Sequence, residues 1–168
     1  MTTQLSSIGV LHRAHRLGRA RAQRGVGLIE VLVAVLLLSI AFLGVAALQA
    51  KSLSTNNSAM ARSMATMASY SILDAMRADY DVAIAGGYNT GSAIKANACP
   101  AADSTLKNMQ LNDWCTQLGQ ALGQTETTTG SIACSGTQGD CTVTITFDDS
   151  RAGKGGASNQ TVVTKGML

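Results

Sequence analysis

The pattern of apolar and polar positions changes twice along the chain, and its first part is apolar on every side. Between Val26 and Leu48 the sequence reads VGLIEVLVAVLLLSIAFLGVAAL, in which Glu30 is the one ionisable residue. The 20 residues from Val31 to Ala50 carry no charge. At about 1.5 Å per residue, a helix of that length crosses a hydrocarbon core of about 30 Å. The pattern therefore predicts a transmembrane helix over residues 26–50.

Beyond the apolar run, residues 49–82 change to an amphipathic helical period. Apolar residues recur there mostly at steps of three and four, at Met60, Met64, Met67, Ala68, Ile72, Met76 and Tyr80. We expect this stripe, methionines included, to pack on a sheet as part of the core. With no proline before Pro100, the prediction is one long helix over residues 26–82, with a local bend allowed at 56–58.

After Gly86-Gly87 the pattern changes again, to a head rich in glycine and threonine over residues 83–168. A short helical segment is predicted at 104–122, with a break allowed near Asn112. Strands are predicted at 131–134, 141–147 and 160–164. We expect Trp114 to anchor the core of this head, and the Asp148-Asp149 pair to be solvated surface. The fold class is therefore α+β, a long N-terminal helix packed on a small antiparallel sheet.

Charge is distributed unevenly, and this limits the functions that the chain can have. Five of the 13 basic residues lie in the first 25 positions without an acid among them. The rest of the chain contains the other eight basic residues and all 10 acidic ones. The basic character therefore belongs to the N-terminus, which predicts a cytoplasmic N-terminus and an exported C-terminal part. It does not indicate nucleic-acid binding. Both histidines, His12 and His15, also lie in this leader, so the remainder lacks the commonest general base.

Four cysteines, all in the head, indicate a disulfide framework in an exported domain. Of the three connectivities we favour Cys99–Cys115 and Cys134–Cys141, because both close short loops around predicted elements. The spacings match no zinc site, and no phosphate-binding loop or nucleophile motif is present. We expect no metal, no cofactor and no enzymatic activity.

The segment from Arg24 to Ala34, RGVGLIEVLVA, resembles the class III signal of type IV prepilins and pseudopilins. That signal is a basic leader ending in glycine, followed by an apolar residue, a small residue, two aliphatics and a glutamate before a long apolar helix. The resemblance implies cleavage after Gly25 by a prepilin peptidase and N-methylation of Val26. It also implies that Glu30 neutralises the terminal amine of a neighbouring subunit. The family usually has Phe and then Thr or Ser where this chain has Val26 and Gly27, which favours a minor member.

The exit from the apolar segment and the helix beyond it resemble minor pilins of the PilV type, in Leu48-Gln49, Ala61-Arg62-Ser63 and the run from Asp74 to Ala78. The resemblance implies a cleaved leader at 1–25, a helix at 26–82 and a periplasmic head at 83–168. The expected function is structural, in an initiation or tip complex of the type IV pilus. Its expected partners are other major and minor pilins, the prepilin peptidase, the inner-membrane assembly platform and membrane lipid.

Two alternatives remain open at this point. A minor pseudopilin of type II secretion would share the same leader, helix and head. A periplasmic binding or adhesion module on an uncleaved signal anchor would instead keep its N-terminus intact. An ordinary signal peptide cut near Ala50 is disfavoured because the apolar run exceeds the usual length of about 7–15 residues.

Overall fold

The computed structural model describes residues 25–135, 139–150 and 156–168. The predicted leader, up to Arg24, and both histidines lie outside these residues. The chain divides into two compact units between Phe42 and Leu43. One helix, α1, runs from Leu28 to Ala78 over 51 residues. The long N-terminal helix of the predicted fold is thereby confirmed, and it is unbroken at residues 56–58, where a bend had been allowed.

α1 ends at Ala78, four residues before the end predicted from the pattern. Asp79 leaves helical geometry, with φ −126° and ψ 50°, and a second helix, α2 (Tyr80–Ile84), starts directly after it. The turn that follows uses Gly86, whose φ of +80° lies in the region that favours glycine. The Gly86-Gly87 signal therefore marks the end of α2.

A four-stranded antiparallel sheet forms the other half of the head, with strand order β1-β2-β3-β4. Its strands are β1 (Ile94–Lys95), β2 (Thr129–Ser135), β3 (Asp140–Phe147) and β4 (Gln160–Met167). β2 pairs with β3 in a hairpin and β3 pairs with β4. The three predicted strands are all present, each slightly longer than predicted, and the α+β class is confirmed. β1 was not predicted.

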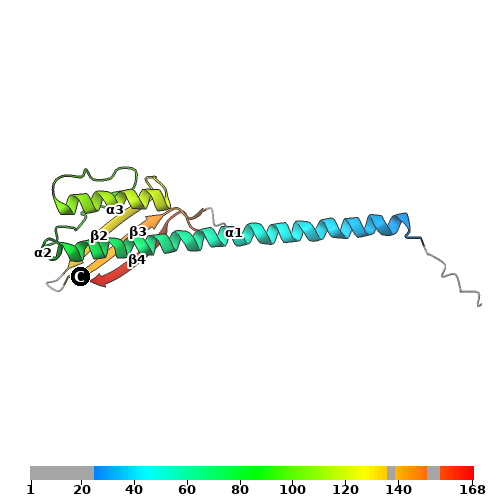
Figure 1. The fold of residues 1–168 in the computed structure, drawn as a ribbon, viewed down its shortest axis with the longest axis horizontal. Coiled ribbons are helices and arrows are strands. Elements are labelled where there is room, and N and C mark those ends of the chain that lie inside the picture. Colours follow the sequence, from blue (N-terminus) through cyan, green and yellow to red (C-terminus); the bar gives the residue numbers. More distant parts are fainter. Residues whose placement is uncertain (1–24, 136–138, 151–155) are drawn as a thin grey trace, which may run out of the picture. The chain divides into compact units, whose positions relative to one another are not determined.

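Both long helices of the head pack on the same face of this sheet (Figure 1). A Cβ placed on Gly130 of β2 would meet Trp114 and Leu118 of α3 (Leu106–Leu122), and one on Gly166 of β4 would meet Leu73 of α1. Gly130 pairs with Ile145 and Gly166 with Cys141. Ile145 and Cys141 are an even number of residues apart on β3, so both glycines lie on one face.

The observed core confirms that Trp114 is buried, but it leaves part of the predicted methionine stripe exposed. Trp114 is 2% exposed, and its indole Nε1 donates to the carbonyl of Ala68 at 3.0 Å. Met76 is buried, but Met60 and Met67 are 57% and 60% exposed, and Tyr80 is 40% exposed. The buried face of α1 consists of Ser58, Ala65, Ala68, Ser69, Ile72, Leu73 and Met76. Small Ala and Ser side chains form much of that face, and of Met60, Met67 and Met76 it includes Met76 alone.

α3 begins at Thr105, whose side chain accepts a hydrogen bond from the backbone N–H of Asn108 at 3.4 Å. This is a standard N-cap. The helix continues through Asn112, where a break had been allowed. The Asn112 side chain instead donates to the carbonyl of Pro100 at 2.7 Å, so it ties the preceding loop to the helix.

Candidate assembly site

The residues that the sequence analysis singled out lie at the N-terminal end of α1. Gly25, Val26 and Gly27 are not helical, and the backbone N–H groups of Glu30 and Val31 donate to the carbonyl of Gly27 at 3.0 and 3.3 Å. Glu30 therefore lies in the first turn of α1. A carboxylate there interacts favourably with the positive end of the helix dipole.

Val26 and Glu30 lie on one side of this end of the helix. Both line a shallow hollow, which is completed by Val31, Ala34, Val35 and Leu38. Apart from the Glu30 carboxylate, its side chains are aliphatic. An extra Cβ on Gly25 or Gly27 would meet no atom of the described residues within 4 Å.

The segment that follows exposes large apolar side chains throughout. Its most apolar 18-residue window has a mean hydropathy of 2.9 and none of it is buried. By length and composition α1 can cross a membrane. Exposed fractions of 60% at Leu32, 65% at Phe42 and 73% at Leu48 show that this surface needs lipid or protein to cover it.

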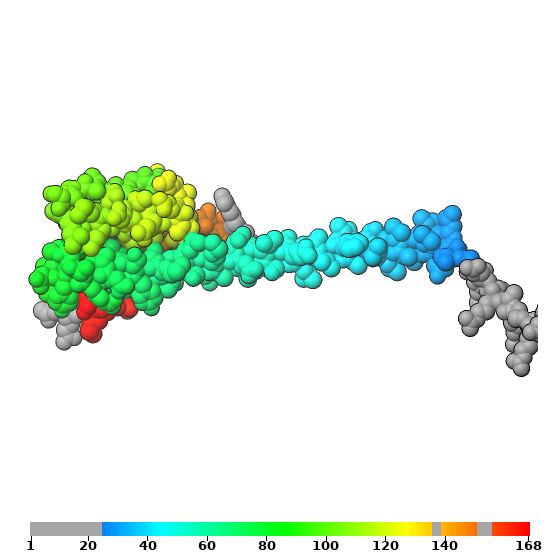
Figure 2. All heavy atoms as spheres, viewed as in Figure 1, coloured from blue at the N-terminus to red at the C-terminus, as the bar shows by residue number. Residues whose placement is uncertain are grey.

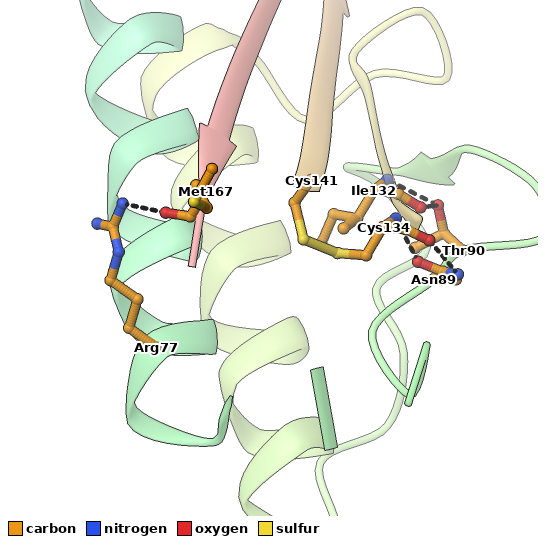
Figure 3. Close-up of a disulfide and its surroundings, with 7 residues drawn as sticks. All are labelled: Arg77, Asn89, Thr90, Ile132, Cys134, Cys141 and Met167. Atoms are coloured by element: carbon orange, nitrogen blue, oxygen red, sulfur yellow. Dashed lines mark hydrogen bonds between the residues drawn. A yellow bond between two sulfur atoms is a disulfide. The ribbon is translucent and has the colours of Figure 1, made fainter. Parts of the chain in front are cut away.

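The four cysteines form two disulfides, Cys99–Cys115 and Cys134–Cys141, which is the pairing that the short loops favoured. The first joins the loop before α3 to the middle of that helix. The second joins residues that face each other directly across β2 and β3 (Figure 3). Both lie in the unit from Leu43 to Leu168, whereas Glu30 lies in the other unit. The cysteines therefore stabilise the head.

Two side chains complete the edge of β2 beyond the short β1 (Figure 3). The Asn89 amide accepts from the backbone N–H of Cys134 at 2.6 Å and donates to its carbonyl at 3.1 Å. Thr90 accepts from the backbone N–H of Ile132 at 3.0 Å, and its own N–H donates to the Ile132 carbonyl at 3.0 Å. These bonds satisfy groups that an added strand would otherwise pair with.

α1 runs alongside β4 at the opposite edge. Arg62 donates to the side-chain oxygen of Gln160 at 3.0 Å, at the start of the strand. Arg77 donates to the carbonyl of Met167 at 2.8 Å, at its end (Figure 3). The two arginines therefore fix the register of the helix along the strand.

A buried polar pair also joins α1 to the residues that follow β3, and no local sequence pattern predicts it. The hydroxyl of Ser58 donates to the carboxylate of Asp149, and the two residues are 7% and 6% exposed. A guanidinium nitrogen of Arg62 lies 4.0 Å from the same carboxylate. The expectation that Asp148-Asp149 is solvated surface is therefore wrong for Asp149 and right for the exposed Asp148.

Tyr88, buried in the head, links the end of α1 to α3. Its hydroxyl lies 2.9 Å from the carboxylate of Asp79 and also contacts the side-chain oxygen of Gln110. Burial raises the pKa of the Tyr88 hydroxyl above its ordinary value, and the hydrogen bond to Asp79 and the charge of Asp79 raise it further. The hydroxyl therefore stays protonated and donating at physiological pH.

The described residues contain no group of three or more His, Cys, Asp or Glu side chains placed to hold a metal ion. The polar pairs above tie helices to strands and do not converge on a pocket. Among the described residues, the candidate site is therefore the N-terminal part of α1, where exposed apolar side chains surround the carboxylate of Glu30.

Comparison with known families points to the same part of the chain. The family described as the prokaryotic N-terminal methylation motif matches residues 20–46. No curated protein and no solved structure matches the chain. The matched residues include Gly25, Val26 and Glu30, and the motif is of the prepilin type. It supports a type IV pilin-like or pseudopilin protein, a membrane-anchored structural protein that prepilin peptidase processes and that assembles with other pilins.

Proposed function

We propose that this protein is a minor pilin of the type IV pilus, of the PilV type, acting in an initiation or tip complex. The match of the methylation motif to residues 20–46 carries the proposal. It is supported by Glu30 in the first turn of an uncovered apolar helix and by a small disulfide-bonded head. The departures at Val26 and Gly27 from the usual start of the family favour a minor subunit over a major one.

Processing would act on the bond between Gly25 and Val26. Cleavage there removes the basic leader of residues 1–25 and frees the amine of Val26, which is then methylated. Residues 26–82 remain as the helix, whose first part, 26–50, holds the protein in the inner membrane, with residues 83–168 as the periplasmic head. From the membrane the subunit passes into the extracellular pilus.

Glu30 would provide recruitment and alignment in the filament. An amine and a carboxylate surrounded by apolar helices are each costly alone and far less so as a pair. The carboxylate of Glu30 lies on the same side of the helix end as Val26. Under this proposal it would accept hydrogen bonds from the methylated amine of a neighbouring subunit while the helices pack side by side.

Mass spectrometry of the N-terminal peptide tests the proposal, with and without the prepilin peptidase. We expect a peptide that begins at Val26 and carries one methyl group, and recovery of the protein in sheared pili. An intact leader would instead make it a signal-anchored module, and a start after Ala50 an ordinary secreted domain. A methylated start with recovery only among type II secretion components would make it a pseudopilin.

A further inference from the structure

The two edges of the sheet are completed in different ways. On the β2 side, Asn89 and Thr90 bond the backbone groups that β1 leaves unpaired. On the other side, β4 pairs with β3 and with no other strand of the described residues. Figure 2 shows the C-terminal part of β4, in red, at the surface beside α1. The outer edge of β4 is therefore the edge of the sheet to which another strand could be added.

The hydrogen bonds of the β3–β4 ladder identify which backbone groups point outward. The N–H of Leu168 donates to the carbonyl of Gly139 at 3.1 Å, one position beyond the last pair of the ladder. Hydrogen-bonded and non-hydrogen-bonded pairs alternate along an antiparallel ladder. Every second residue back from Leu168 therefore bonds to β3, Thr164 among them. The N–H and C=O groups of Val163 and Lys165 point away from β3.

Side chains close the outer edge only at its two ends. At one end, Arg77 donates to the carbonyl of Met167 at 2.8 Å (Figure 3). At the other, the amide of Gln160 donates to the carbonyl of Thr161 at 3.4 Å. Between these ends, no group of the described residues bonds the outward N–H and C=O groups of the two central residues. The middle of β4 therefore offers backbone donors and acceptors to a partner.

The side chains along this open stretch are apolar and cationic. Val163 and Met167 are 55% and 59% exposed, and Lys165 lies between them on the same face of the strand. β4 contains no acid, and Lys165 forms no ion pair with the described residues. Asp140, at the start of β3, lies opposite Met167 instead. Lys165 is therefore a cation without a cross-strand partner.

This charge distinguishes between the strands that could pair here. Two antiparallel copies of β4 would bring two copies of Lys165 into one short ladder with no acid opposite either of them, and an edge lysine commonly prevents such self-pairing. A segment with a carboxylate opposite Lys165 and an apolar residue opposite Val163 complements both positions. The charge of the edge therefore favours an acidic segment of a different protein.

We propose that the outer edge of β4 accepts an extended segment of another protein as an added strand, with aspartate or glutamate opposite Lys165 and an apolar residue opposite Val163. Antiparallel pairing supplies up to about four backbone hydrogen bonds from these two residues. Tyr70, which is 55% exposed, lies about 20° around α1 from Arg77 and flanks the added strand. This inference goes beyond the proposed function, since it depends on β4 and not on the N-terminal motif.

Synthetic peptides test the pairing on the full chain in detergent micelles. The probes are short peptides of alternating valine and threonine, with glutamate or lysine at the position opposite Lys165. We expect the glutamate peptide to slow hydrogen exchange of the Val163 and Lys165 amides, measured by nuclear magnetic resonance, and to bind about three- to tenfold more tightly than the lysine peptide. No protection at about 1 mM peptide, or equal affinity for both peptides, would overturn the proposal.

Two substitutions separate the contributions of backbone and charge. Val163→Pro removes an outward N–H and no bond to β3, so it should lower the affinity for the glutamate peptide by about tenfold or more. Val163→Thr, the matched control, keeps that N–H and should bind normally. Lys165→Glu should reverse the preference to the lysine peptide, and it tests the pairing independently of any effect of proline on folding. An unchanged preference in the Lys165→Glu variant would contradict the proposed register.

A photo-cross-linking amino acid in place of Val163 identifies the partner in cells. We expect a product joined to an extended segment of another protein, with an acidic residue beside the cross-linked position. The matched control is the same substitution at Ala133, which is exposed on the face of the sheet away from this edge and should not give that product. Products only with a second copy of this chain or with a helical segment, or no product, would overturn the proposal.

Discussion

A single carboxylate in an apolar helix is the most informative residue of the chain. Glu30 lies in the first turn of α1 beside a hollow of aliphatic side chains. The helix dipole favours a negative charge at that end by a few tenths of a kcal/mol to about 1 kcal/mol. That is small against the several kcal/mol that burial of an unpaired ion costs. Packing among other apolar helices would therefore favour a cationic partner, and under the proposed function that partner is the terminal amine of a processed neighbour.

Replacing Glu30 tests this pairing. Glu30→Ala and Glu30→Gln should both leave cleavage after Gly25 intact and lower recovery in sheared pili by at least about tenfold, because either one leaves a neighbour's amine unpaired. Glu30→Asp, which keeps the charge, should retain more recovery than Glu30→Gln, which keeps the length. Quantitative immunoblotting of pilus and membrane fractions measures the effect. Normal recruitment of the alanine variant would contradict the role given to Glu30.

Residue-level predictions from the sequence succeeded where one feature decided the outcome. Trp114, the single tryptophan, is large and apolar enough to require burial, and it is buried. Asp148 and Asp149 look alike in sequence, yet Asp149 alone meets Ser58 on a helix 91 residues earlier. That distinction depends on how the loop after β3 returns to α1, and no local pattern contains it.

At the level of elements, the contact between α3 and β2 depends on a glycine. A Cβ on Gly130 would lie 2.5 Å from the ring of Trp114 and 2.8 Å from Leu118. Trp114 has little freedom to move aside, because its indole N–H is bonded to the Ala68 carbonyl and it is 2% exposed. Gly130 is therefore required by close approach of the helix to the strand.

Gly130→Ala should destabilise the head by about 1–3 kcal/mol, the usual cost of overpacking a core. Gly91→Ala is the matched control, since its Cβ would meet no atom within 4 Å and should leave stability nearly unchanged. Thermal unfolding of the purified protein, followed by Trp114 fluorescence, measures both. Equal melting temperatures for the two variants would show that the helix yields at this contact.

The elements with regular periodicity were predictable, and those built from side chains were not. β3 alternates threonine with valine, isoleucine and phenylalanine, so its pattern alone identifies a half-buried strand. β1 has two residues, and the edge beside it is completed by the side chains of Asn89 and Thr90. An edge completed by side chains in this way has no periodic sequence pattern by which it could be predicted. The buried face of α1 was partly misassigned because several of its residues are small Ala and Ser side chains, while the more apolar Met60 and Met67 are exposed.

At the level of the whole molecule, the chain consists of two units with different requirements. The unit up to Phe42 buries little of its apolar surface within the described residues and depends on lipid or other subunits. The unit from Leu43 has its own core, to which α1 contributes Ala65, Ala68 and Ile72. The second part of α1 is therefore structural in the head, even though it is continuous in sequence with the membrane segment.

Two truncations separate these requirements. A fragment beginning at Gln49 keeps every α1 residue in the core, so it should be soluble, form both disulfides and unfold cooperatively. A fragment beginning at Tyr70 lacks Ala65 and Ala68, including the carbonyl that accepts the indole N–H of Trp114. It should lose cooperative unfolding and the near-ultraviolet circular dichroism of Trp114, since a helix core contact and a buried hydrogen bond disappear together. The chain has one tryptophan, which makes that signal specific. A native tryptophan signal in the shorter fragment would show that the sheet and α3 form the core without α1.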